Sequence, residues 1–187
     1  MLFRSQELNR VAANTVVNYE AHFKRLKRVI DDYAIQQGDT YNMDETGFRL
    51  GVGGSQWVIT TGIDAVQSGS DTNRDFCTAI ETISGDGVVL PPFLVLKGSA
   101  HLEKWYKNTS LPASYAVTVS ETGYNNDELS LGWLEHFDSW SRRRQTGLWR
   151  LLIFDGFGSH CTKEFLDYCD AQSIVCFTLP PHTSHNL

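Results

Sequence analysis

The chain has 187 residues, a formal net charge of −6, 41% hydrophobic residues and 20% charged residues. This length and balance indicate one globular domain with a substantial core rather than a disordered chain. The pI of about 5.4 argues against a basic protein that holds nucleic acid by bulk charge. No apolar run approaches the roughly 20 residues that cross a bilayer, and the N-terminal residues lack the apolar centre of a secretory signal. We therefore expect an intracellular protein with no membrane partner.

The first predicted element is a helix over about residues 13–34. Its apolar residues recur in steps of four and three, which places them on one helical face: Tyr19, Phe23, Leu26, Ile30 and Tyr33. We treat residues 1–35 as a helical lead-in to the main domain.

A series of strands is predicted next. "DTYNMDETGFRLG" is typical of a short strand that stops at Gly47, and residues 56–61 form a second candidate. Residues 76–84 and 88–96 are β-rich runs around the turn sequence Gly-Asp-Gly, which indicates a hairpin. The Pro91-Pro92 pair inside the second run predicts a sheet edge or a bulge.

The second half of the chain alternates strands and helices. Residues 114–120 form a candidate strand, and a helix is predicted to begin with Asn125 as its N-cap. Its apolar residues are spaced as on one helix face: Leu129, Trp133, Phe137 and Trp140. "WRLLIFD" is typical of a central strand buried on both faces, and a helix (162–172) and a buried strand (173–180) follow it. The order predicts an α/β fold, a mixed sheet flanked by helices.

Two aspartates are placed to carry chemistry. Asp155 ends the buried strand, and ligands gather at the carboxyl ends of strands in α/β sheets. Asp44 holds the same place on the first strand-like segment. Two such carboxylates suit Mg²⁺, which leaves its other positions to water and phosphate, although a single Asp-Gly pair after a strand is more often a turn than a ligand.

Five ordered segments carry a family resemblance: "YNMDETGFRLG", "NRDFCTAIETISGDGVVLPPFLVLKG", "GYNNDELSLGWLEHFD", "RLLIFDGFGSH" and "LPPHTSH". Together they resemble the DDE superfamily endonucleases of pogo/Fot1-type transposases, within the Tc1/mariner group. The resemblance covers the chain from about residue 12 to its last residue.

The resemblance implies an RNase H-like core over residues 36–187. It also implies that Asp44 and Asp155 are the first two catalytic, metal-binding acids and that Mg²⁺ or Mn²⁺ is the cofactor. The family's third acid follows the "HTSH" motif and lies beyond Leu187, so the core is expected to be truncated at its C-terminus and inactive alone. Phe157 stands where relatives commonly have His.

The family further implies DNA, as transposon ends and target, as the partner, with metal-dependent phosphodiester cleavage and strand transfer in the intact protein. A nuclear location and a homodimer are the corresponding expectations. One alternative is a domesticated or decayed derivative that binds DNA or a protein partner without catalysis. Another is a metal hydrolase built from Asp155 with His160, His182 and His185.

Overall fold

The computed structural model of the chain describes residues 16–49, 76–100, 110–155 and 162–180. The helices and strands in these ranges are α2 (Val16–Asp32), β1 (Thr40–Arg49), β2 (Phe76–Ser84), β3 (Phe93–Lys97), β4 (Ala116–Ser120), α4 (Asp127–Ser141), β5 (Arg150–Phe154), α5 (Lys163–Ala171) and β6 (Ile174–Thr178), with short 3-10 helices η1 (Gln37–Asp39) and η2 (Arg142–Arg144). The expected order of helices and strands is confirmed, and the strand predicted at 56–61 lies outside the described residues.

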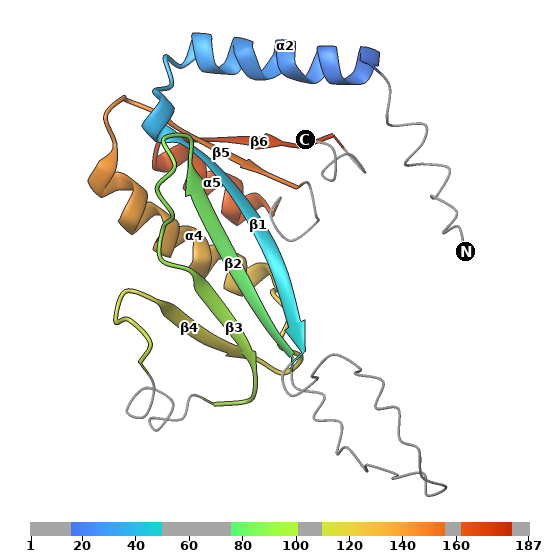
Figure 1. The fold of residues 1–187 in the computed structure, drawn as a ribbon, viewed down its shortest axis with the longest axis vertical. Helices are drawn as coiled ribbons and strands as arrows, with labels where there is room; N and C mark the ends of the chain where they lie inside the picture. The colour runs from blue at the N-terminus through green and yellow to red at the C-terminus, as the bar shows by residue number, and fades with distance from the viewer. Residues whose placement is uncertain (1–15, 50–75, 101–109, 156–161, 181–187) are drawn as a thin grey trace, which may run out of the picture.

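The described strands form one mixed sheet in the order β4-β3-β2-β1-β5-β6 (Figure 1). β1 pairs antiparallel with β2, and β2 with β3. The pairs β1–β5, β5–β6 and β3–β4 are parallel. Parallel neighbours need a crossover connection, which α5 provides between β5 and β6. β1 and β5 are neighbours inside the sheet, although they are far apart in the sequence.

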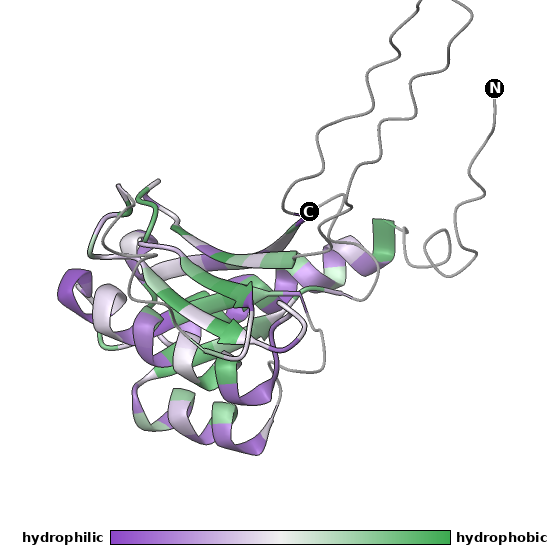
Figure 2. Ribbon diagram, turned by 90° about the horizontal axis from the view of Figure 1, so that it is seen from below, coloured by the Kyte–Doolittle hydropathy of each residue, from purple (hydrophilic) through white to green (hydrophobic). Residues whose placement is uncertain are grey.

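The sheet separates two apolar clusters. Leu152 and Phe154 belong to a cluster with α4 and α5, whereas Leu151 belongs to a cluster with α2 and β6. Neighbouring residues of a strand point to opposite faces, so β5 is covered on both faces, as predicted. Apolar strands lie in the middle and the helices carry polar residues outward (Figure 2). Trp133, on α4, is 1% exposed and is a core residue.

The hairpin between β2 and β3 is present, but its second strand begins later than predicted. The turn is closed by Ser84, whose N–H donates to the Val88 carbonyl at 2.9 Å. The strand expected from Val88 begins only at Phe93, because Pro91 and Pro92 have no N–H to donate to a ladder.

Pro91 and Pro92 also mark a bulge in the ladder. Ile80 pairs with Phe93, and the next bridge joins Ile83 to Val89. Three steps along β2 therefore face four steps on the other side, so one extra residue is inserted there. Of the two alternatives predicted for this position, the bulge is correct, because β3 has a strand on each side.

β1 does not stop at Gly47, as the sequence suggested, but continues to Arg49. Gly47 pairs with Thr78 of β2, and the ring of Phe76 lies across it. A Cβ built on Gly47 would lie 2.3 Å from the Cζ atom of Phe76. The glycine therefore permits close packing of an aromatic ring within the strand instead of ending it.

The N-cap of α4 is Asn126, not Asn125 as predicted. The Asn126 side chain accepts a hydrogen bond from the Leu129 N–H at 2.9 Å. Asn125 has a different role, because its amide donates to Glu45 Oε1 at 2.7 Å and to Ser130 Oγ at 2.8 Å. Asn125 thus links the first strand to the start of α4.

α2 covers residues 16–32 of the predicted helix but turns a different face to the sheet. Leu26 and Ile30 pack against the β5 and β6 side chains as expected, whereas Phe23 is 53% exposed and His22 is only 6% exposed. The predicted face and the observed face of the helix both contain Leu26 and Ile30. The spacing of the apolar residues therefore could not distinguish one face from the other. Within the described ranges, no helix has the length and apolarity needed to span a membrane.

Candidate active site

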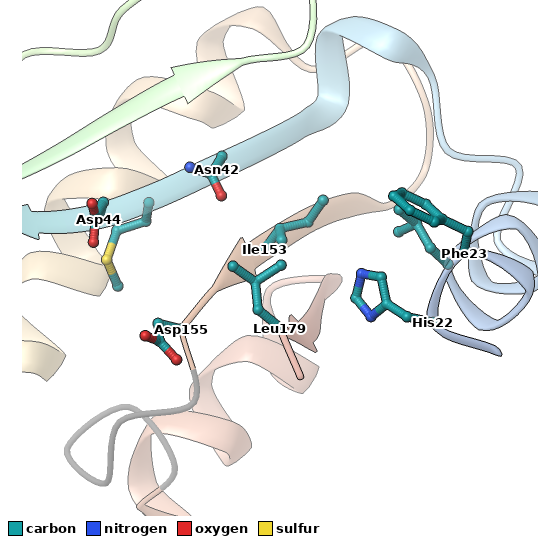
Figure 3. A pocket seen from close by; sticks show the side chains of 9 residues that line it. His22, Phe23, Asn42, Asp44, Ile153, Asp155 and Leu179 are labelled. Atoms are coloured by element: carbon teal, nitrogen blue, oxygen red, sulfur yellow. The ribbon is translucent and has the colours of Figure 1, made fainter. Parts of the chain in front are cut away.

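Asp44 and Asp155 lie next to each other across two parallel strands. The last pair in the register of β1 and β5 is Met43 with Phe154, and the following residues are the two aspartates. Figure 3 shows both side chains on the side of the pocket away from α2, with Asp155 just beyond the end of β5 and Asp44 on the neighbouring strand β1. Asp155 comes directly after β5, as predicted. Asp44 lies inside β1, because that strand continues to Arg49.

The two carboxylates line one pocket with a volume of about 330 Å³. Its remaining lining comes from α2, the middle of β1 and β5, and the residue after β6: His22, Phe23, Leu26, Asn42, Met43, Ile153 and Leu179. Asn42 and Asp44 are two residues apart on one strand and share a face. The sequence reasoning missed Asn42, although this spacing could have identified it.

The neighbours of Asp44 differ in where they point. The Glu45 carboxylate binds the Asn125 amide at the start of α4, so it points away from the pocket, as expected from alternation along a strand. The Glu45 N–H donates to Asp44 Oδ1 at 2.9 Å and holds that carboxylate in place. Glu81 is paired directly opposite Asp44 on β2, and like charges in such a pair repel each other.

α2 is fastened beside the pocket by Arg25. Its guanidinium donates to the Thr178 carbonyl at 3.1 Å and lies 4.6 Å from the ring centroid of Phe177. The Phe177 ring is also 5.2 Å from the imidazole of His22. The end of β6 therefore fixes the helix turn that carries His22.

His22 is buried without a complete set of partners. Its side chain is 6% exposed, and its Nδ1 atom has no hydrogen-bond partner among the described residues. Burial, and secondly the charge of Arg25, lower its pKa below the usual 6.5. Sequence reasoning missed this residue, although its spacing of four and seven from Leu26 and Val29 matches a helix face.

The lowered pKa of His22 predicts a pH-dependent stability. As the pH falls through 6.5, the unfolded chain protonates this ring while the folded chain resists protonation. The unfolded state then binds more protons, so the free energy of unfolding should decrease as the pH falls below 6.5. Urea unfolding of the wild type and of His22→Gln at pH values on both sides of 6.5 measures this contribution. A pH dependence of the same steepness in both proteins would contradict it.

The donors in the pocket suit a hard divalent cation. Two carboxylates and the Asn42 amide are oxygen donors of the kind that Mg²⁺ and Mn²⁺ accept. Across the described ranges, no group of three or more His, Cys, Asp or Glu side chains could hold a metal. His160, His182 and His185 lie outside the described residues, so the alternative that uses them is untested.

The fold is RNase H-like and matches solved structures of the Mos1 transposase. Its strand transfer complex has a TM-score of 0.54 at 11% identity, covering 98% of this chain and 46% of that one. Its paired-end complex with the left transposon end has a TM-score of 0.51 at 9% identity, covering 96% and 45%. The mariner paired-end complex with Mn has a TM-score of 0.51 at 10% identity, covering 97% and 46%. The predicted fold class is confirmed.

Sequence comparison gives the family. The model of the DDE superfamily endonuclease matches residues 73–187, more than half of the chain. The chain belongs to this superfamily, as a DDE domain of the pogo/Tc1-mariner kind, which confirms the resemblance in the sequence motifs.

The relatives are longer proteins. The human protein named Pogo transposable element with KRAB domain is 25% identical over 181 residues, 94% of this chain and 28% of that protein. The mouse protein of the same name is 28% identical over 167 residues, which cover 85% of this chain and 25% of that protein. A Cochliobolus lunatus protein named MFS-type transporter clz9 is 35% identical over 160 residues, which cover 83% of this chain and 17% of that protein. The chain thus spans less than a third of the length of these curated relatives.

Proposed function

We propose that this chain is the core of a DNA endonuclease and transposase domain, in which Asp44 and Asp155 hold Mg²⁺ or Mn²⁺. One observation carries the proposal: two carboxylates from neighbouring parallel strands follow the last paired residues and line the same pocket. Membership of the DDE superfamily supports it. The solved Mos1 complexes, which contain transposon ends and in one case Mn, support DNA and a divalent cation as its ligands.

The residues around the pocket have distinct tasks in this proposal. The bound cation would activate the attacking water or 3′-hydroxyl and neutralise the leaving oxygen of a phosphodiester. The hydrogen bond from the Glu45 N–H fixes the orientation of the Asp44 carboxylate. The Asn42 amide lies on the same strand face as Asp44 and can hydrogen-bond a phosphate oxygen. Apolar side chains such as Ile153 and Leu179 restrict water on one side of the pocket.

The resemblance implies a third acid beyond Leu187, so the activity test is designed around a longer chain. We expect metal-dependent cleavage only from a chain extended through that acid. The substrate is supercoiled plasmid carrying the terminal sequences of the element, and nicking with Mn²⁺ is measured on gels. Asp44→Asn should lower the nicking rate by at least about 10³-fold, as loss of an essential group does in other hydrolytic sites.

The matched control is Glu81→Gln, which removes the same charge from the position opposite Asp44 without altering the pocket lining. It should keep the nicking rate within about threefold, since it touches no reacting group. Nicking that Asp44→Asn leaves unchanged would refute the assigned role. Cleavage absent from the extended chain, together with DNA binding that needs no metal, would favour the non-catalytic derivative. A nuclear location and a homodimer, which the family resemblance implies, belong to this proposal.

A further inference from the structure

Strand β1 loses one of its two neighbours just before Asp44. Its parallel pairing with β5 ends at Met43 and Phe154, whereas its antiparallel pairing with β2 continues to Arg49. Asp44 is therefore the first residue of a segment that, among the described strands, is paired along one edge only. A segment with fewer attachments moves more easily, and a rotation of β1 about its axis here would turn the Asp44 carboxylate away from Asp155.

The residue after Asp44 attaches this segment on the other face of the sheet. The Glu45 N–H donates to Asp44 Oδ1 at 2.9 Å, so the backbone at Glu45 and the Asp44 carboxylate move together. The Glu45 carboxylate lies on the α4 side, where its Oε1 atom accepts a hydrogen bond from Asn125 Nδ2 at 2.7 Å. Neighbouring side chains of a strand point to opposite faces. Fixing Glu45 on one face therefore fixes the direction of Asp44 on the other.

Asn125 is itself held at both ends of the short segment that precedes α4. Its amide nitrogen also donates to Ser130 Oγ, near the start of α4, at 2.8 Å. Two residues before Asn125, the carbonyl of Gly123 accepts a hydrogen bond from Thr78 Oγ1 of β2 at 2.9 Å. An ionised carboxylate only accepts hydrogen bonds, so the Glu45 carboxylate requires the amide nitrogen of Asn125 to face it. The segment thus presents a fixed donor to β1.

We infer that Glu45 and Asn125 are positioning residues of the metal site. Their hydrogen bond holds the part of β1 beyond β5 in the orientation that directs the Asp44 carboxylate to a cation shared with Asp155. Neither Glu45 nor Asn125 lines the pocket, so both act through Asp44 and not by contact with the cation. The inference rests on the proposed function, because it needs Asp44 and Asp155 to be the ligands.

The test compares the Mn²⁺ affinity of the 187-residue chain with that of its variants by isothermal titration calorimetry. Glu45→Ala and Asn125→Ala each remove the hydrogen bond between the two side chains. Each should lower the affinity about tenfold, the low end of the effect of groups that orient a metal ligand. Glu45→Gln removes the charge but keeps an oxygen that accepts from Asn125, so its affinity should stay within about threefold of the wild type.

Ser130→Ala is the matched control for a general loosening at the start of α4. It removes the other hydrogen bond of the same Asn125 amide and leaves the bond to Glu45 in place, so the Mn²⁺ affinity should change by less than about threefold. Urea unfolding of every variant measures the loss of stability separately. Equal losses of affinity in Ser130→Ala and Asn125→Ala would show a purely structural role and overturn the inference. Equal losses in Glu45→Gln and Glu45→Ala would overturn it too, because Glu45 would then act through its charge.

Asp155→Asn separates this inference from the proposed function. If Asp155→Asn loses Mn²⁺ binding while Glu45→Ala and Asn125→Ala bind as tightly as the wild type, the metal site stands and the positioning role is wrong. If Asp155→Asn binds Mn²⁺ as the wild type does, or the wild type binds none, the assigned ligands are wrong and the positioning role is overturned with them.

Discussion

Replacing Asp155 with Asn should lower the Mn²⁺ affinity of the chain by more than about 100-fold. Loss of a group that only orients a metal ligand lowers metal affinity by about 10–100-fold. Asp155→Asn should have a larger effect, because it removes one of the two carboxylates in the pocket. Isothermal titration calorimetry of the wild type and of Asp155→Asn measures the change directly. Asp44→Asn should have an effect of similar size, since its carboxylate occupies the equivalent place on β1.

The experiment needs a control for charge alone, and Glu81→Gln supplies it. Glu81 is opposite Asp44 on β2 and exposed, so its replacement removes one negative charge near the pocket without removing a lining side chain. We expect its Mn²⁺ affinity to fall by less than about threefold, the size of a screened interaction between exposed charges. Equal losses in Glu81→Gln and Asp155→Asn would show that Mn²⁺ responds only to local charge, and would contradict the assigned ligands.

The second large effect concerns stability and lies at the other end of β5. Arg150 is fully buried, and its Nη2 atom is 2.7 Å from Oδ1 of Asp138 on α4. The same guanidinium donates to Ser141 Oγ at 2.7 Å and to the Gln172 carbonyl at 2.8 Å. Asp138→Ala would leave this cation buried without its counter-charge, and breaking such a pair costs about 3–5 kcal/mol. Urea unfolding followed by circular dichroism measures the loss.

Arg142 provides the matched control for this prediction. It also pairs with Asp138, at 2.9 Å, but its side chain is 54% exposed. Arg142→Ala should therefore cost less than about 1 kcal/mol. Equal losses of unfolding free energy in Asp138→Ala and Arg142→Ala would contradict the prediction. They would show that the buried pair of Arg150 with Asp138 stabilises the fold no more than an exposed pair does.

Local sequence patterns predicted the elements better than their contacts. The apolar run of β5 and the periodicity of α4 identified a buried strand and a helix, because both signals depend on a few neighbouring residues. The predicted end at Gly47 was wrong, since the reason for that glycine is the ring of Phe76, which comes from another strand. Arg150 likewise lies inside an apolar run, and no local signal shows that α4 supplies its counter-charge.

For the candidate site, the sequence by itself determined the fold family, through five motifs in order, and singled out Asp44 and Asp155. Only the tertiary structure decided that β1 lies parallel to β5, which brings these aspartates to one pocket. The same holds for His22, which reaches the pocket because Arg25 ties α2 to the end of β6. The physical reason is the range of the interactions. Strand and helix patterns arise from neighbours along the chain, whereas strand pairing and helix docking join distant residues whose partners no single segment specifies.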